Sequence, residues 1–121
     1  MGKKILVVDD QEDIRNLLTA SLETCGHEIR LASDGAEAWE ALQNQKPDLL
    51  ITDINMPNLS GLELLRKIRE HPDLKDLPVI MLTGQDSDAE ILSGLSRGAD
   101  HYITKPFTIK SVLNGIQMVT S

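Results

Sequence analysis

Short apolar runs alternate with amphipathic segments along the whole chain, and this alternation limits the folds that the chain can adopt. The clearest runs are residues 5–8, 48–52 and 79–82, which consist mainly of leucine, isoleucine, valine and methionine. Continuous apolar runs of this length are typical of strands that are buried on both faces of a sheet. Strands that alternate with helices form a parallel sheet with right-handed crossovers. We therefore predict an α/β fold, a doubly wound parallel sheet covered by helices on both faces.

The boundaries of these elements follow from capping signals and from the spacing of apolar residues. Asp34 and Ser60 each precede a glutamate by three positions, which is the pattern of a helix N-terminus. Cys25 is expected on the apolar face of the first helix, which Gly26 should end. Strands are expected at residues 5–8, 28–32, 48–52, 79–82 and 102–104, and helices at residues 14–25, 35–42, 61–68, 88–97 and 108–121. No linker separates these elements, so residues 1–121 are expected to form one domain.

The amino-acid composition argues against nucleic acids and membranes as binding partners. The formal net charge is −7, which disfavours attraction to nucleic acids and to anionic membranes. No apolar stretch approaches membrane-spanning length and no signal peptide precedes the first strand, so a cytoplasmic protein is expected. The single cysteine, Cys25, excludes an intramolecular disulfide.

Polar side chains stand at the carboxyl ends of four predicted strands. They are Asp9 and Asp10 after the first strand, Asp53 after the third, Thr83 after the fourth and Lys105 after the fifth. Taken singly, each is an ordinary turn, loop or surface residue. Because doubly wound sheets bind ligands at the carboxyl ends of their strands, all of these side chains are expected to converge on one edge. Their joint placement therefore favours a functional site.

The predicted cluster combines ligands for a divalent cation with groups that stabilise a phosphoryl group. Clustered carboxylates suit Mg²⁺, which binds through one or two protein carboxylates and several waters. A metal ion, a hydroxyl and an ammonium around a further carboxylate resemble the groups that stabilise phosphoryl transfer. Asp53 is then the candidate nucleophile, which would form an acyl phosphate.

These residues also carry a family resemblance that covers the whole chain. The matching segments are Val7-Val8-Asp9-Asp10, Asp53-Ile54-Asn55-Met56-Pro57 with Gly61, Leu82-Thr83, Gly98-Ala99-Asp100 and Tyr102-Ile103-Thr104-Lys105-Pro106-Phe107. With these segments, the sequence resembles the receiver domain of bacterial two-component response regulators. The resemblance implies a flavodoxin-like fold with strand order 2-1-3-4-5.

The resemblance implies that Asp53 is a phosphorylation site in a phosphorelay. Asp53 would accept a phosphoryl group from the phosphohistidine of a sensor histidine kinase or of a histidine phosphotransfer domain. Asp10 and Asp53 are the implied Mg²⁺ ligands, with the backbone carbonyl of Asn55 as a third and Asp9 acting largely through water. The chain would catalyse only its own phosphorylation and dephosphorylation, and is expected to be a signalling protein rather than an enzyme.

The resemblance also implies a switch that responds to phosphorylation. Lys105 would pair with the Asp53 carboxylate and then with the phosphoryl group, and the Lys105–Pro106 peptide bond would be cis. Thr83 would move to bond a phosphoryl oxygen, and Tyr102 would swing inward behind it. This coupling is a two-state element that phosphorylation biases, changing a face that docks partners.

Further expectations concern the lifetime of the acyl phosphate and the output of the switch. Asn55 and Gln85 are expected to set that lifetime, and Gly94 either allows close packing or softens the fourth helix. His101 and the single charged residue of the last helix, Lys110, disfavour the charge-paired dimer of some DNA-binding relatives. A monomer or a weak phosphorylation-dependent dimer is expected. The sequence leaves open a stand-alone regulator that docks a downstream protein, or a receiver whose output domain is missing.

Three other classes of protein fit the residues less well. A flavodoxin needs a phosphate-binding loop rich in Ser, Thr and Gly after the first strand, whereas residues 9–13 are acidic. A haloacid-dehalogenase-type phosphatase needs an Asp-x-Asp pair, in which Asn55 replaces the second acid. A pseudo-receiver, which is a pure interaction module, is the better rival, although such domains have usually lost one of the acids or the lysine. The acids Asp9, Asp10 and Asp53 and the lysine Lys105 are all present in this sequence.

Overall fold

A parallel sheet forms the centre of the computed structural model, which describes residues 2–84 and 98–120. Within these residues, five strands pair in the order β2-β1-β3-β4-β5. The strands are β1 (Lys4–Val8), β2 (Glu28–Ala32), β3 (Leu49–Asp53), β4 (Val79–Thr83) and β5 (His101–Thr104). The helices are α1 (Glu12–Thr24), α2 (Gly35–Asn44), α3 (Gly61–Glu70) and α5 (Ile109–Thr120). The predicted doubly wound fold and its strand order are confirmed.

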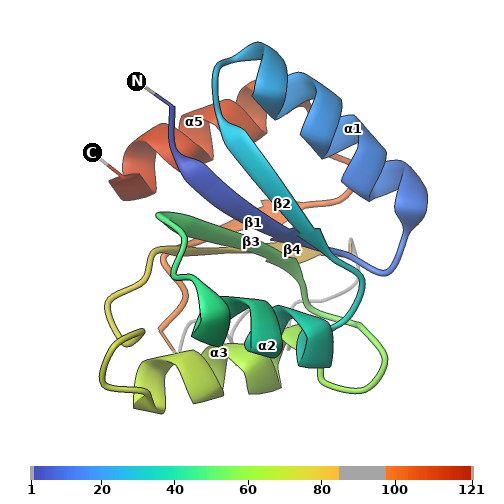
Figure 1. Ribbon diagram of the computed structural model, residues 1–121. Coiled ribbons are helices and arrows are strands. Elements are labelled where there is room, and N and C mark those ends of the chain that lie inside the picture. Colours follow the sequence, from blue (N-terminus) through green and yellow to red (C-terminus); the bar gives the residue numbers. More distant parts are fainter. Residues whose placement is uncertain (1, 85–97, 121) are drawn as a thin grey trace.

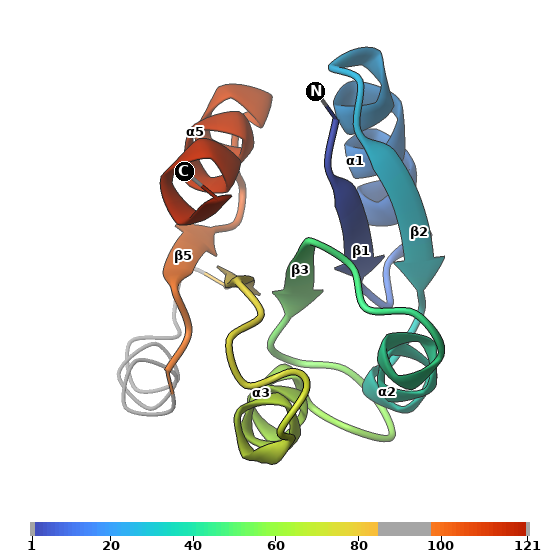
Figure 2. The same cartoon turned by 60° about the vertical axis from the view of Figure 1, so that its left-hand side comes forward.

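Helices cover both faces of the sheet. α1 and α5 lie on one face, and α2 and α3 lie on the other (Figure 1), as the view in Figure 2 also shows. Alternate residues of a strand point to opposite faces, so β1 contributes Leu6 and Val8 to one apolar cluster and Ile5 and Val7 to the other. Every residue of β3 and β4 is buried. This burial on both faces explains why their sequences are continuous apolar runs.

The first helix ends one residue earlier than predicted. α1 ends at Thr24, and Cys25 is an exposed residue after it, so its expected place on the apolar face is wrong. Leu18 and Leu22 face the core, whereas Leu17 is 45% exposed. Gly26 has φ of 92°, a backbone conformation that glycine adopts without strain. The predicted stop at Gly26 is therefore confirmed.

The two predicted helix caps are confirmed. Oδ1 of Asp34 accepts a hydrogen bond of 2.8 Å from the Glu37 N–H. Ser60 and Glu63 form a reciprocal capping box at the start of α3. The helix predicted at residues 88–97, which includes Gly94, lies outside the described residues. None of the helices in the described part of the chain is long and apolar enough to cross a membrane.

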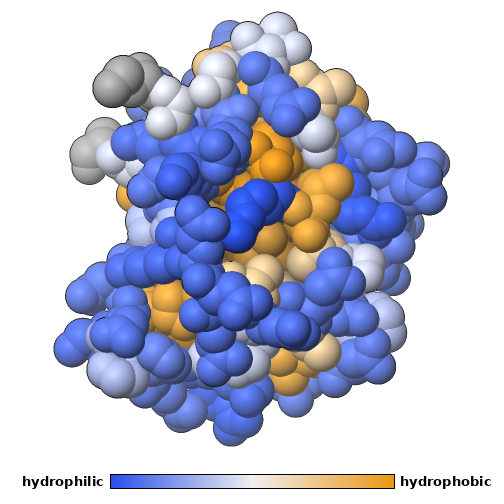
Figure 3. All heavy atoms as spheres, in the orientation of Figure 1, coloured by the Kyte–Doolittle hydropathy of each residue, from blue (hydrophilic) through white to orange (hydrophobic). Residues whose placement is uncertain are grey.

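The surface around the edge strand β2 mixes apolar and charged side chains. Figure 3 shows hydrophobic side chains around β2 on an otherwise mainly hydrophilic face. Leu31 of this strand is 42% exposed, and Glu28 and Arg30 alternate with its apolar residues. Charged side chains on an edge strand oppose pairing with another sheet. The charged residues of β2 therefore protect this edge of the sheet against pairing with another sheet. In the strand order, β2 is remote from β4 and β5.

Candidate functional site

Strand register brings the predicted polar residues to one edge of the sheet. Asp53 and Thr83 are the last residues of β3 and β4, which pair in parallel. Thr83 pairs with Thr104 of β5, so Lys105 follows at the same edge. Asp9 directly follows β1, which pairs in parallel with β3. The fold therefore places these side chains at the ends of four adjacent strands.

Three carboxylates of this cluster are close enough to hold one metal ion. Oxygen atoms of Asp9, Asp10 and Asp53 lie within 4.8 Å of one another. Asp9 is fully buried and Asp53 is 8% exposed, whereas Asp10 is exposed to solvent. An ion at this position would have protein oxygens on one side and water on the other. This donor set fits Mg²⁺, which prefers oxygen ligands and keeps several waters.

The Lys105 ammonium lies between two of these carboxylates. Its Nζ is 2.8 Å from Oδ2 of Asp9 and 3.4 Å from Oδ2 of Asp53. The resemblance implied Asp53 as the partner, but the shorter contact is to Asp9, which is the more buried carboxylate. A buried charge requires a compensating charge and hydrogen bonds. The Lys105–Pro106 peptide bond is cis, the isomer that the resemblance implies.

Two residues that the sequence did not single out hold Asp9 in place. The backbone N–H of Gln11 donates to Oδ1 of Asp9 at 2.9 Å. Nη1 of Arg15 donates to the backbone carbonyl of Asp9 at 2.6 Å. Gln11 acts through its backbone, so its residue type gives no signal. A basic residue two positions after the acidic segment 9–13 is the signal that could have identified Arg15.

Burial and charge shift the pKa values of Asp53 and Lys105. Burial raises the pKa of the Asp53 carboxyl, and the charge of Lys105 lowers it without cancelling that effect. Burial lowers the pKa of the Lys105 ammonium, but the hydrogen bond to Asp9 and the charge of Asp53 outweigh burial, so this pKa is raised. Lys105 therefore stays protonated at neutral pH, whereas the fold without a metal ion disfavours ionisation of Asp53.

Replacing Asp53 with asparagine is expected to stabilise the metal-free protein at neutral pH. Asparagine mimics the protonated carboxyl, which the fold favours because the pKa of Asp53 is raised above 3.8. The folded wild type then binds more protons than the unfolded chain, so its free energy of unfolding falls as the pH rises from 3.8 through the raised pKa. Asp53→Asn should therefore have the higher free energy of unfolding at neutral pH, and this difference should disappear in stronger acid. Thermal unfolding in EDTA across this pH range measures it, and equal stabilities at neutral pH would contradict it.

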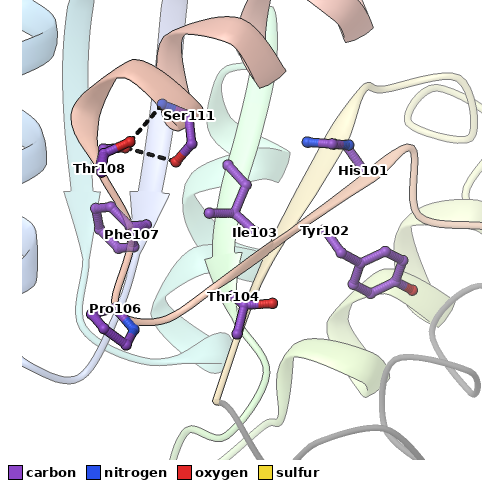
Figure 4. Close-up of a pocket in the computed structure, with 8 residues that line it drawn as sticks. All are labelled: His101, Tyr102, Ile103, Thr104, Pro106, Phe107, Thr108 and Ser111. Carbon is purple, nitrogen blue, oxygen red and sulfur yellow. Dashed lines mark hydrogen bonds between the residues drawn. The ribbon is translucent and has the colours of Figure 1, made fainter.

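The hydroxyl groups of Thr83 and Tyr102 are buried without a hydrogen-bond partner in the described part of the structure. A buried hydroxyl without a partner costs about 1–3 kcal/mol, so each would gain from an acceptor brought into reach. Burial raises the pKa of the Tyr102 hydroxyl, which therefore remains a donor at neutral pH. Tyr102 and Thr108 line a cavity of about 370 Å³, and Figure 4 shows the Tyr102 side chain pointing away from Phe107.

Asn55 lies in the loop between β3 and α3, two residues after Asp53. This loop begins at the carboxyl end of β3, so Asn55 is close in sequence to Asp53 of the acidic cluster. The Thr52 hydroxyl donates to the Asp53 carbonyl at 3.0 Å at the start of the loop. Gln85, the other residue expected to set the lifetime of the acyl phosphate, lies outside the described residues. Its role stays a prediction.

Comparison with known proteins identifies the family of this chain. Residues 5–117 match the sequence model of the response regulator receiver domain. The chain belongs to the response regulator receiver domain family. The expected relationship to two-component signalling is therefore confirmed.

Close relatives of this receiver domain include longer proteins. The response regulator MprA of Mycobacterium ulcerans (strain Agy99) is 44% identical over 113 residues, which are 93% of this chain and 48% of MprA. The alkaline phosphatase synthesis transcriptional regulatory protein PhoP of Bacillus subtilis (strain 168) is 43% identical over 112 residues, which are 93% of this chain and 46% of PhoP. The chain thus spans about half the length of these relatives.

Solved structures show the same receiver fold in chains of different lengths. The chemotaxis response regulator CheY4 of Vibrio cholerae has a TM-score of 0.92 and 34% identity, covering 98% of this chain and 99% of that chain. NtrX from Brucella abortus has a TM-score of 0.92 and 35% identity, covering 99% of this chain and 27% of that chain. The fold of this chain therefore matches almost the whole CheY4 chain but only about a quarter of the NtrX chain.

Proposed function

We propose that residues 1–121 form a single receiver domain that acts as a phosphorylation-dependent signalling switch, with Asp53 as the phosphoacceptor. The observation that carries the proposal is the position of the Asp53 carboxylate. It is 3.4 Å from the Lys105 ammonium and belongs to a carboxylate cluster that fits a divalent cation. Nucleophile, cation site and fixed positive charge are the parts that phosphoryl transfer requires.

In the proposed reaction, an oxygen of Asp53 attacks the phosphorus of a phosphohistidine on a sensor histidine kinase or a histidine phosphotransfer domain. A phosphorus–oxygen bond forms, the phosphorus–nitrogen bond breaks, and the leaving imidazole takes up a proton from solvent. A bound Mg²⁺ would be held by Asp10, Asp53 and the backbone carbonyl of Asn55, with Asp9 acting mainly through water, and would offset negative charge on the phosphoryl oxygens. Lys105 would contact the transferred group from the protein side.

The switch would follow from the two buried hydroxyls. A phosphoryl oxygen on Asp53 would give the Thr83 hydroxyl an acceptor, and Tyr102 would move inward behind Thr83. The cavity beside Tyr102 on β5 and α5 (Figure 4) would then change shape. In this proposal it docks a downstream protein target, or an output domain elsewhere in a longer protein. We further propose that residues 1–121 are monomeric or form a weak dimer on phosphorylation. Their formal net charge of −7 disfavours direct binding to nucleic acids.

The proposal is tested by incubating the protein with Mg²⁺ and a small acyl phosphate or phosphoramidate, followed by measurement of the intact mass. We expect one added phosphoryl group on the wild type, none in EDTA, and none on Asp53→Asn. Absence of the added group from the wild type would overturn the proposal and favour a pure interaction module. Persistence of the group on Asp53→Asn would place the acceptor elsewhere and would also overturn it.

A further inference from the structure

The loop between β3 and α3, which carries Asn55, is closed tightly at its base. The Gly61 N–H donates to the Ile54 carbonyl at 2.7 Å. A Cβ at position 61 would lie 2.2 Å from the Asp53 carbonyl oxygen, so only glycine allows this approach of the two backbones. The base of the loop and the backbone of Asp53 therefore form one packed unit.

The tip of this loop is tied to a different part of the molecule, the turn between β2 and α2. Asn58 has φ of 70°, and its Nδ2 donates to Oδ2 of Asp34 at 2.8 Å. The other oxygen of Asp34 accepts the Glu37 N–H at the start of α2. Gly35 packs so closely against the loop that a Cβ there would lie 2.1 Å from the Leu59 carbonyl oxygen. One carboxylate therefore caps a helix and holds the loop at the same time.

The charge of Asp34 strengthens both of its contacts. The Glu37 N–H and the Asn58 amide favour the ionised carboxylate, and they lower the pKa of Asp34. Hydrogen bonds that a carboxylate accepts are shorter and stronger than those between neutral groups. At neutral pH, the tie between the turn and the loop is therefore a charge-assisted hydrogen bond.

We propose that Asp34 and Asn58 form a clamp that positions the β3–α3 loop and, through it, the magnesium site at Asp53. The clamp rests on the proposed function, in which the carbonyl of Asn55 is a metal ligand on this loop. Mg²⁺ demands nearly octahedral geometry at short distances, so it is sensitive to small displacements of a ligand. Asp34 and Asn58 are positioning residues, which act on the ion through the loop.

Two variants separate this clamp from the capping of α2. Asn58→Gly removes the side-chain amide, while glycine still adopts the positive φ without strain. Asp34→Ser keeps a good N-cap for α2 but removes the oxygen that faces Asn58. We expect Mg²⁺ to bind about threefold to tenfold more weakly to both variants, less than the loss of about 10- to 100-fold that removal of a direct outer partner of a metal ligand causes.

Two further variants serve as matched controls. Glu37→Gln removes one negative charge from the same turn without touching the loop, so Mg²⁺ affinity should stay within about twofold of wild type because exposed charges are screened. The double variant Asp34→Asn with Asn58→Asp keeps the net charge and restores the hydrogen bond with donor and acceptor exchanged. Both residue types suit their positions, since Asn caps helices well and Asp tolerates a positive φ. This swap is expected to recover wild-type affinity.

The experiment is a calorimetric titration of each variant of residues 1–121 with Mg²⁺ alone, together with a measurement of its free energy of unfolding in EDTA. Weaker binding by both single variants, with recovery in the swap, supports the clamp. Wild-type affinity in Asn58→Gly overturns it, and so does a loss that the swap fails to recover. A wild type that binds no Mg²⁺ and takes up no phosphoryl group instead refutes the proposed function, so the two failures are distinguishable.

Discussion

Replacing Lys105 with methionine is expected to slow phosphorylation of Asp53 by about a hundredfold, the typical loss when one fixed donor to a developing anion is removed. Methionine fills a similar volume but lacks the ammonium that lies 3.4 Å from Oδ2 of Asp53. The proposed transfer then lacks the protein's own positive charge beside the phosphoryl group. The rate of labelling by a small acyl phosphate, followed by intact mass, measures the effect.

The same substitution is expected to lower the free energy of unfolding of the metal-free protein by about 3 kcal/mol, because it leaves a buried carboxylate without its partner. That carboxylate is Asp9, which is fully buried and 2.8 Å from Nζ of Lys105. Because the pKa of Lys105 is raised above 10.5, this stabilisation is fully present below pH 10.5 and is lost as the pH rises through the raised value. Adding Mg²⁺ should restore part of it, since the ion would replace the missing positive charge.

Lys110→Met is the matched control for this prediction. It makes the same chemical change at an exposed lysine of α5. Surface substitutions of this kind usually change stability by less than about 0.5 kcal/mol. If Lys105→Met and Lys110→Met showed the same labelling rate and the same stability, the role of Lys105 in the acidic cluster would be refuted.

The edge of the sheet that carries the site was predictable because it depends on local patterns. Continuous apolar runs identify β3 and β4, since both strands are buried on both faces. Parallel pairing then brings the carboxyl ends of neighbouring strands together, so Asp53 and Thr83 had to meet at one edge. The starts of α2 and α3 were predictable for the same reason, because the caps at Asp34 and Ser60 involve residues only three positions apart.

Contacts that depend on the reach of side chains were not predictable in this way. Lys105 and Asp9 are 96 positions apart, and no local pattern indicates that the Lys105 ammonium contacts Asp9 at 2.8 Å as well as Asp53 at 3.4 Å. The contact between Asn58 and Asp34 joins two loops, which carry no periodic pattern. The apolar spacing of the first helix also extends to Cys25, although α1 ends at Thr24 and Cys25 is exposed. Residue placement alone predicted a cation site and Asp53 as the candidate nucleophile. The family resemblance added the roles expected of Thr83 and Tyr102.

Replacing Arg69 with alanine is expected to lower the free energy of unfolding by about 3 kcal/mol, since hydrogen bonds to charged groups contribute about 1.5–3 kcal/mol each and are not additive. Within the described residues, the Arg69 guanidinium on α3 donates five hydrogen bonds, with distances from 2.7 to 3.0 Å. They end on the backbone carbonyls of Gly98, Lys75 and Leu77 and on Oδ2 of Asp100. The side chain is 21% exposed, so solvent would replace these bonds incompletely.

Two variants on the same helix calibrate this effect. Arg69→Lys is expected to lose most of the stabilisation, because one ammonium lacks the planar fork that reaches several acceptors at once. Arg66→Ala changes an exposed arginine of α3 and should alter stability by less than about 0.5 kcal/mol. Urea unfolding of the metal-free proteins measures all three, and equal stability of Arg69→Ala and Arg66→Ala would contradict the prediction.

The contacts of Arg69 also indicate where local unfolding of Arg69→Ala should begin. Oδ2 of Asp100 accepts the N–H of Val79 at 2.8 Å, and the Asp100 N–H donates to the Val79 carbonyl at 3.0 Å. Arg69 therefore fixes the entry to β4 and β5, the strands that lead to Thr83 and Lys105. In Arg69→Ala, hydrogen exchange should accelerate at the Val79 and Asp100 amides more than in β1, because local openings begin where contacts are lost. Uniform acceleration across the sheet would show that the guanidinium stabilises the fold as a whole and does not hold this corner in particular.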